Sequence, residues 1–198
     1  MWEHPYSAFL GLVERPGRYV GGEYGAAAAP ARVGARAVLA FPDAYEVGTS
    51  HIGLAVLYEA VNREPGLAAE RVFMPWPDLE RELRAARVPL VSLESARPLR
   101  DFDLVGFSLQ YELTYTNLVA MLDLGGVARR AAHRGEQAPI VVAGGPAAAH
   151  CEPLAPFLDL VVVGDGEEAL PALMRRLAEL RARGAGRAER VRELAALP

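Results

Sequence analysis

The sequence contains a single cysteine, Cys151, among its 198 residues. One cysteine cannot form a disulfide within the chain, and it cannot supply the several thiolates that a cluster or a multi-cysteine metal site needs. The chain also lacks any apolar run near the roughly 20 residues of a membrane-spanning helix, and its start lacks the basic-then-apolar order of a secretory signal. We therefore expect a cytoplasmic protein with no membrane segment and no iron–sulfur cluster of its own.

An excess of charge of one sign is also missing. The formal net charge is −4, and 21 basic residues are scattered among 25 acidic ones. The densest basic stretch, residues 175–192, is interleaved with glutamates, which is typical of a solvated helix face. The sequence therefore offers no clear electrostatic footprint for nucleic acid.

Motifs of several common enzyme classes are missing as well. The chain has no Walker A sequence, no G-x-G-x-x-G after its first predicted strand and no G-x-S-x-G nucleophile elbow. His51 and His150 have no convincing further metal ligand at a suitable sequence spacing. These absences argue against a P-loop or dinucleotide-binding protein, a serine hydrolase and a zinc enzyme.

Composition divides the chain into three parts. Residues 1–34 hold three prolines, a glycine pair and an alanine run, which predict an irregular arm with one short helix near Ser7–Val13. Residues 35–183 alternate short β-rich apolar runs with longer amphipathic segments, the pattern of βαβ units. Residues 184–198 follow a Gly-Ala-Gly break with apolar residues at helical spacing, which predicts a C-terminal helix leading to a further domain.

Five apolar runs in the middle part are predicted strands, because nearly continuous apolar runs are typical of a parallel sheet covered on both faces. They are Arg36–Phe41, Arg71–Met74, Leu104–Ser108, Ile140–Ala143 and Leu160–Val163. The expected helices are Ser50–Asn62, Asp78–Ala86, Thr114–Arg134 and Glu167–Arg183, the last with a buried stripe of Leu170, Leu173, Met174, Leu177 and Leu180. The pattern predicts a doubly wound, mostly parallel five-stranded α/β fold of the flavodoxin-like or Rossmann-like kind.

Ligands of such a sheet bind outside the carboxyl ends of the strands, where loop amides and helix N-termini converge. The loop after the first strand has the form D-x-Y-x-x-G, with Asp43, Tyr45 and Gly48. Asp43 can accept hydrogen bonds within the loop, and Tyr45 can reach the edge of a planar ligand. An ordinary loop before a helix capped by Ser50 explains the same residues.

Two further loops carry candidate contacts. After the third strand, Ser108, Leu109 and Gln110 place a hydroxyl and an amide near the crevice. After the fourth, Gly144 and Gly145 allow close approach of a bulky ligand, although a tight turn needs glycine equally well. Each of these signals is weak when taken alone.

The loop after the fifth strand contains Gly164, Asp165 and Gly166, with Glu168 three residues after the aspartate. That spacing matches a capping box, in which Asp165 caps the following helix. Two glycines on either side of an acid also suit the rim of a ligand site.

Taken in order, these loops resemble the cobalamin-binding domain, whose pattern is D-x-H-x-x-G after the first strand, S-x-L or a near variant after the third and G-G after the fourth. Longer stretches, among them PDAYEVGTSHIGL, ERVFMPWPDLE and VVAGGPAAAHCEPLAPFLDLVVVGDGEE, are similar to the N-terminal part of a family of cobalamin-domain radical-SAM proteins. The resemblance covers nearly the whole chain. It implies that cobalamin is bound by Asp43, Tyr45, Gly48, Ser108, Leu109, Gln110, Gly144, Gly145, Gly164 and Gly166.

The resemblance also implies a partner, the protein's own downstream radical-SAM domain. In that family a C-x-x-x-C-x-x-C motif holds a [4Fe–4S] cluster that cleaves S-adenosylmethionine. The parent protein is then expected to perform radical chemistry on a small-molecule substrate that the sequence does not identify. The present chain, which carries one cysteine, is expected to have no turnover by itself.

One position departs from the pattern, because Tyr45 stands where the cobalt-ligating histidine is found. A phenol with a pKa of about 10 must lose its proton before it can bind cobalt. We therefore expect cobalamin, if bound, to have no histidine ligand at this position, with its lower axial face open, water-bound or shielded by Tyr45. The nucleotide tail would run between Ser108 and Gly144-Gly145. His51 is a remote second candidate for the cobalt ligand.

Two alternatives remain open at the level of sequence. The first is a structural or interaction module of the same fold that has lost cobalamin binding, as the departure at Tyr45 allows. The second is an independent flavodoxin-like domain for another small molecule, which the acidic loop at residues 164–168 does not favour.

Overall fold

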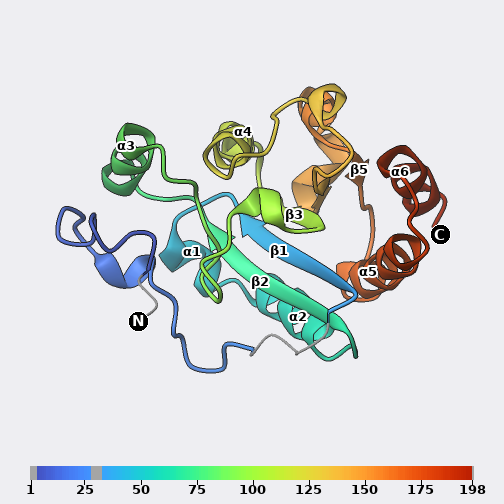
Figure 1. The fold of residues 1–198 in the computed structure, drawn as a ribbon, viewed down its shortest axis with the longest axis horizontal. Helices are drawn as coiled ribbons and strands as arrows, with labels where there is room; N and C mark the ends of the chain where they lie inside the picture. The colour runs from blue at the N-terminus through green and yellow to red at the C-terminus, as the bar shows by residue number, and fades with distance from the viewer. Residues whose placement is uncertain (1–3, 28–32, 198) are drawn as a thin grey trace.

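The computed structural model describes residues 4–27 and 33–197 (Figure 1). They contain a five-stranded sheet with the order β2-β1-β3-β4-β5, in which every pair of neighbours is parallel. The strands are β1 Ala35–Phe41, β2 Leu67–Phe73, β3 Leu104–Ser108, β4 Ile140–Gly144 and β5 Leu160–Val161. The predicted doubly wound α/β fold is confirmed. The chain order reverses between β1 and β3, which makes that crevice the topological switch point.

Helices cover both faces of the sheet. They are α1 Tyr45–Thr49, α2 Ile52–Asn62, α3 Pro77–Ala86, α4 Tyr115–Leu124, α5 Gly166–Ala182 and α6 Arg187–Ala195. Figure 1 shows α3 and α4 on one side of the sheet and α2 and α5 on the other, with α6 beside α5. No helix in the described part of the chain is both long and apolar enough to cross a membrane.

The sheet separates two apolar cores. Since successive side chains of a strand point to opposite faces, β3 sends Val105 and Phe107 into the core below α3 and α4, and Leu104 into the core below α2 and α5. The predicted apolar stripe of α5 is confirmed: Leu170, Leu173, Met174, Leu177 and Leu180 are all buried in the second core.

Two helices differ from the prediction. The helix expected over Thr114–Arg134 ends at Leu124, because two glycines follow and Gly126 adopts a left-handed φ of 73°. The helix expected over Ser50–Asn62 is preceded by the separate short helix α1 and is capped by the side chain of His51. The Ser50 hydroxyl instead donates to carbonyls of the preceding turn.

The N-terminal arm packs against the β2 side of the molecule. The short helix predicted near Ser7–Val13 is wrong, because these residues form successive turns that lead to a 3₁₀ turn at Pro16–Arg18. A helix this short is marginal by itself, so tertiary contacts decide the conformation. Among them, the buried Tyr6 hydroxyl accepts a hydrogen bond from the Val91 N–H at 2.8 Å. Residues 1–3 and 28–32 of the predicted arm, and Pro198 of the predicted tail, lie outside the described residues.

A buried charge network fixes α6 at the amino end of β5. The Asp159 carboxylate accepts hydrogen bonds from Arg134 at 2.9 Å, from Arg187 at 2.7 Å and from the Val141 N–H at 2.8 Å. The side chains of Arg134 and Asp159 are 0% and 4% exposed. Two guanidinium groups and one carboxylate therefore hold β4, β5 and the start of α6 together.

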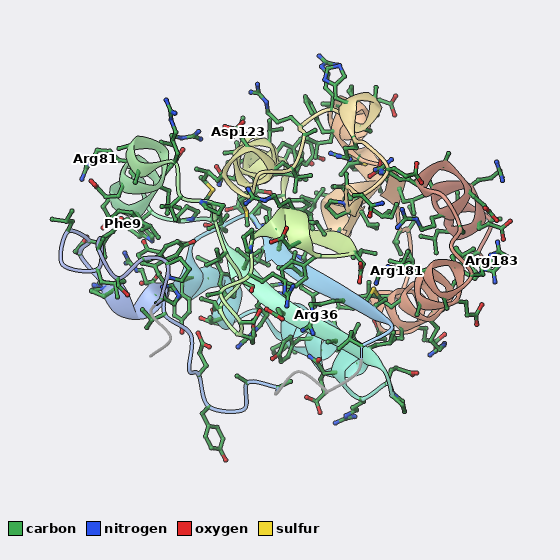
Figure 2. All side chains as sticks on the ribbon, viewed as in Figure 1. Phe9, Arg36, Arg81, Asp123, Arg181 and Arg183 are labelled. Carbon is green, nitrogen blue, oxygen red and sulfur yellow. The ribbon has the colours of Figure 1, made fainter. Side chains whose placement is uncertain are left out.

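Arginines on the outer helices are paired with carboxylates. Arg181 of α5 contacts Asp103 at the amino end of β3, and Arg183 contacts Glu189. The two arginines are labelled in Figure 2. The exposed Arg183–Glu189 pair agrees with the predicted solvated face over residues 175–192, but the prediction is wrong at Arg187 and Arg190, whose side chains are only 11% and 12% exposed.

Candidate ligand-binding site

A cavity of about 400 Å³ opens between α2 and α5 at the carboxyl end of the sheet. Cavities of this size are in the range of small-molecule sites. Its lining includes six of the ten predicted site residues, Ser108, Gln110, Gly144, Gly145, Gly164 and Gly166. The other four, Asp43, Tyr45, Gly48 and Leu109, lie outside the lining. The structure thus brings together the loops after β3, β4 and β5 and places the loop after β1 elsewhere.

The floor of the cavity is open because side chains are missing there. On the face toward α2 and α5, β3 presents Leu104, Gly106 and Ser108 in succession, and Ser108 pairs with Gly144 of β4. A Cβ on Gly106 would contact leucine side chains at 3.3 Å or more, and one on Gly144 would meet Val162 at 3.7 Å or more. Side chains at these positions would therefore project into the cavity.

The walls are the apolar faces of α2 and α5. Leu54 and Leu57 line the cavity from α2, and Leu170 lines it from α5. Gly166 lets the two helices approach, since a Cβ there would lie 3.0 Å from a methyl carbon of Leu57. A flat apolar group fits between such walls better than a charged one.

His51 lines the cavity as the N-cap residue of α2. Its Nδ1 accepts the Leu54 N–H at 3.1 Å, and its ring packs against Phe41 at a centroid distance of 5.1 Å. When Nδ1 accepts a hydrogen bond, the proton of the neutral ring is on Nε2, so this nitrogen is a donor. A metal ligand needs a free lone pair on Nε2, usually with Nδ1 donating to a partner. The capping contact therefore disfavours His51 as the cobalt ligand.

Ser108 and Gln110 form a polar pair in the lining. The Gln110 side-chain amide donates to the Ser108 Oγ at 3.0 Å, which leaves the serine hydroxyl proton free for another acceptor. Leu109 between them is fully buried in the core below α3 and α4, and its N–H donates to the Gly144 carbonyl at 2.8 Å. Leu109 therefore supports the loop without facing the cavity.

Gly145 is a position that only glycine fills without strain. Its φ is 100°, and a Cβ there would lie 2.6 Å from the Leu109 carbonyl oxygen. The loop after β4 can therefore lie directly against the loop after β3, which closes this end of the cavity.

Tyr45 points toward the N-terminal arm. Its hydroxyl donates to the Glu23 carboxylate at 3.2 Å, and its ring meets Phe73 edge-on at 5.5 Å. Burial, followed by the nearby negative charge of Glu23, raises the pKa of Tyr45, which keeps the phenol protonated. Sequence reasoning missed this contact because nothing in the local pattern relates residue 23 to residue 45.

The remaining residues of the first loop organise the switch point. Asp43 accepts the Ala44 N–H at 2.7 Å with one carboxylate oxygen and the Tyr111 hydroxyl with the other. This second bond joins the loops after β1 and β3, and it raises the pKa of Tyr111. Gly48 is a packing glycine, because a Cβ there would lie 2.2 Å from a ring carbon of Phe73.

The N-terminus of α5 carries acidic side chains at the cavity. Asp165 occupies the N-cap position, but its side chain makes no capping hydrogen bond, so the predicted capping box is wrong. Glu167 and Glu168 lie in the first turn, and Glu167 lines the cavity. Their negative charge opposes a phosphate at this helix end, although the helix dipole would favour one.

An exposed apolar rim surrounds the carboxyl end of the sheet. We define it by Ile52, Trp76, Leu113 and Val163, which follow β1, β2, β3 and β5 and are 79%, 40%, 84% and 78% exposed. Large apolar side chains gathered at one edge are typical of binding surfaces.

Residues 53–198 match the family model described as "Radical SAM proteins, N-terminal". The match covers well over half of the chain, and it includes both walls and most of the floor of the cavity. No curated protein matches the chain in sequence.

Proposed function

The chain belongs to the family of N-terminal regions of radical-SAM proteins, and from its cavity we propose that it binds a corrinoid such as cobalamin. The nucleotide tail would occupy the cavity between α2 and α5, and the corrin ring would lie over the carboxyl end of the sheet. The observation that carries this proposal is the glycine floor formed by Gly106 and Gly144, which leaves space below two apolar helix faces.

The residues present suit such a ligand. The apolar walls and the glycine floor accept the flat aromatic base of a nucleotide tail, and Ser108 and His51 offer donors to its polar atoms. The apolar rim at Ile52, Leu113 and Val163 can lie against a large ring system or a second domain. When bound, a corrinoid supplies a cobalt centre that can accept and release an alkyl group.

We further propose that the cobalt receives no imidazole from this chain at the position that the D-x-H-x-x-G pattern provides. Tyr45 is bonded to Glu23 and stays protonated, and His51 uses Nδ1 to cap α2. If the tail base is held in the cavity, it also cannot bind cobalt. A bound corrinoid would therefore have the visible spectrum of a cofactor whose own base is detached and which receives no imidazole from Tyr45's position or from His51.

The proposed partner is the radical-SAM domain of the same protein. That domain would bind the [4Fe–4S] cluster and S-adenosylmethionine and act on a small-molecule substrate, while this chain would present the corrinoid to it. The exposed rim at the carboxyl end of the sheet is the surface that such a domain would cover.

A second candidate function is a structural module that no longer binds the cofactor. The observation that favours it is the Tyr45–Glu23 hydrogen bond, which commits the histidine position of the pattern to packing against the arm. The two functions share the fold and differ in the use of the cavity.

The test is binding of hydroxocobalamin to the 198-residue chain and to the full-length protein, followed by gel filtration and a visible spectrum. Cobinamide, which has the corrin ring but no nucleotide tail, is the matched ligand. We expect retained cobalamin with its base detached, and binding of cobinamide at least about tenfold weaker because it leaves the cavity empty. Failure of the full-length protein to retain cobalamin would contradict the proposal and favour the structural module.

A further inference from the structure

We infer that the cavity selects corrinoids by the base of the nucleotide tail and favours an apolar bicyclic base, such as dimethylbenzimidazole, over a purine. This inference rests on the proposed function. Its basis is the distribution of polar groups along the cavity.

The deep part of the cavity is apolar. Its floor is formed by Leu39 of β1, Gly106 of β3, Val142 of β4 and Val162, which directly follows β5. Leu54 and Leu170 close it from the two helices. None of these six lining residues has a polar side chain. A buried base therefore finds carbon atoms on its sides and below it.

The sheet backbone below the cavity has few free hydrogen-bonding groups. Gly106 lies in β3, which pairs with β1 on one side and β4 on the other, and Val142 lies in β4 between β3 and β5. Backbone groups that bond within a ladder are already satisfied. The floor therefore has few free donors or acceptors for a ligand.

The polar side chains of the lining are confined to the loop end. His51 and Glu167 lie at the N-termini of α2 and α5, and Ser108 and Gln110 lie at and beyond the end of β3. These groups can serve the sugar and the outer edge of a base. They leave the inner edge of the base without a partner.

This arrangement discriminates between bases. Dimethylbenzimidazole presents two methyl groups on its outer ring, whereas adenine presents ring nitrogens and an amino group at the corresponding edge. A polar atom that loses water without gaining a partner weakens binding by about tenfold or more. An apolar base should therefore bind more tightly than a purine.

The experiment is a titration of the full-length protein with cobalamin and with its adenine-tailed analogue, followed by visible absorbance. We expect Kd for the adenine-tailed corrinoid to be about 10- to 100-fold higher. Equal affinity for the two tails would overturn the inference and leave the proposed function standing. Absence of binding of either corrinoid would overturn both.

Two matched variants locate the selectivity. Val142→Thr places a hydroxyl on the cavity floor with almost no change of volume, and it should reduce the preference severalfold by giving a purine nitrogen a partner. Val141→Thr makes the same change on the opposite face of β4, in the core below α3 and α4, and should leave the ratio of the two affinities unchanged. A preference that Val142→Thr leaves intact would contradict the assignment to the floor.

Discussion

The two faces of the sheet use the same strands in different ways. Toward α3 and α4, the chain from β3 onward places Val105, Phe107 and Leu109, all fully or nearly fully buried. Toward α2 and α5, the same strand presents Leu104, then Gly106, which has no side chain, and then the small polar Ser108. One strand thus supplies a filled core on one face and the floor of a cavity on the other.

The difference shows how a small α/β domain can be stable and still keep an open site. Buried apolar residues fill the amino half of both faces, and the cavity between α2 and α5 opens at the carboxyl half of its face. The cavity is placed where loops and helix ends can be changed without loss of the core. We call the side of the sheet under α3 and α4 the closed face and the side under α2 and α5 the open face. Substitutions can test the comparison between them.

The largest expected effect on stability is at the amino end of the sheet, where Asp159 binds Arg134 and Arg187 and anchors α6. Asp159→Ala leaves the buried guanidinium groups of Arg134 and Arg187 without their carboxylate, so the free energy of unfolding should fall by about 3–5 kcal/mol. Urea unfolding measures it. The control is Asp101→Ala, whose side chain is 49% exposed, and which should change stability very little. Equal effects of the two variants would mean that the network does not anchor α6.

The next effect compares leucines on the two faces. Leu118→Ala in α4 removes a fully buried side chain from the closed face and should cost about 2–5 kcal/mol. Leu57→Ala in α2 removes a half-buried side chain beside existing space and should cost less than about 1.5 kcal/mol. Both changes are made within helices, so their intrinsic helix propensities cancel. If denaturant unfolding gave equal losses of unfolding free energy for the two variants, the α2 and α5 face would be packed as tightly as the α3 and α4 face, contrary to this account.

A smaller effect is expected at His51. Loss of the N-cap in His51→Ala should reduce stability by about 1 kcal/mol, whereas His51→Asn keeps a capping acceptor and should restore most of it. Thermal unfolding measures both variants. With bound corrinoid, the two variants should have the same visible spectrum as the wild type. A change in cobalt ligation in the alanine variant would identify His51 as the ligand after all.

The smallest effect concerns Tyr45, whose contribution to stability changes with pH only at high pH. Its pKa is raised above 10.0 by burial and by the Glu23 carboxylate, so the folded chain holds this proton more tightly than the unfolded chain. The resulting stability is complete below about pH 10 and is lost as the pH rises through the folded-state pKa. Tyr45→Phe should therefore flatten the decline in stability above about pH 10, measured by urea unfolding. An unchanged slope would mean that Tyr45 does not pack against the arm.

Much of the fold was predictable, because apolar runs of strand length alternate with amphipathic helices along the chain. The prediction failed where tertiary contacts outweigh local preference. β2 begins at Leu67, earlier than its apolar run suggests, because Ala68 and Ala69 have weak strand preference and are held by pairing with β1. The helix beginning at Tyr115 ends early at a glycine pair that the apolar pattern concealed.

The site was predictable in part for a different reason. Glycines at strand ends, such as Gly144, indicate in the sequence where a ligand can approach the backbone. The structure places several of them around one cavity. Gly106 was missed because a glycine inside an apolar strand carries no loop signal. The direction of Tyr45 was not predictable, since it depends on a long-range contact with Glu23.

The central claim is that the cavity above Gly106 and Gly144 holds the nucleotide tail, because these glycines leave space on the floor. The substitution Gly106→Leu tests this claim most directly. The new side chain fills the cavity from its floor, while Gly135→Leu adds the same side chain in open space. The account predicts that Gly106→Leu folds, loses its preference for cobalamin over cobinamide and binds cobalamin at least about tenfold more weakly, while Gly135→Leu behaves as the wild type. Unchanged cobalamin affinity and preference in a folded Gly106→Leu chain would contradict it.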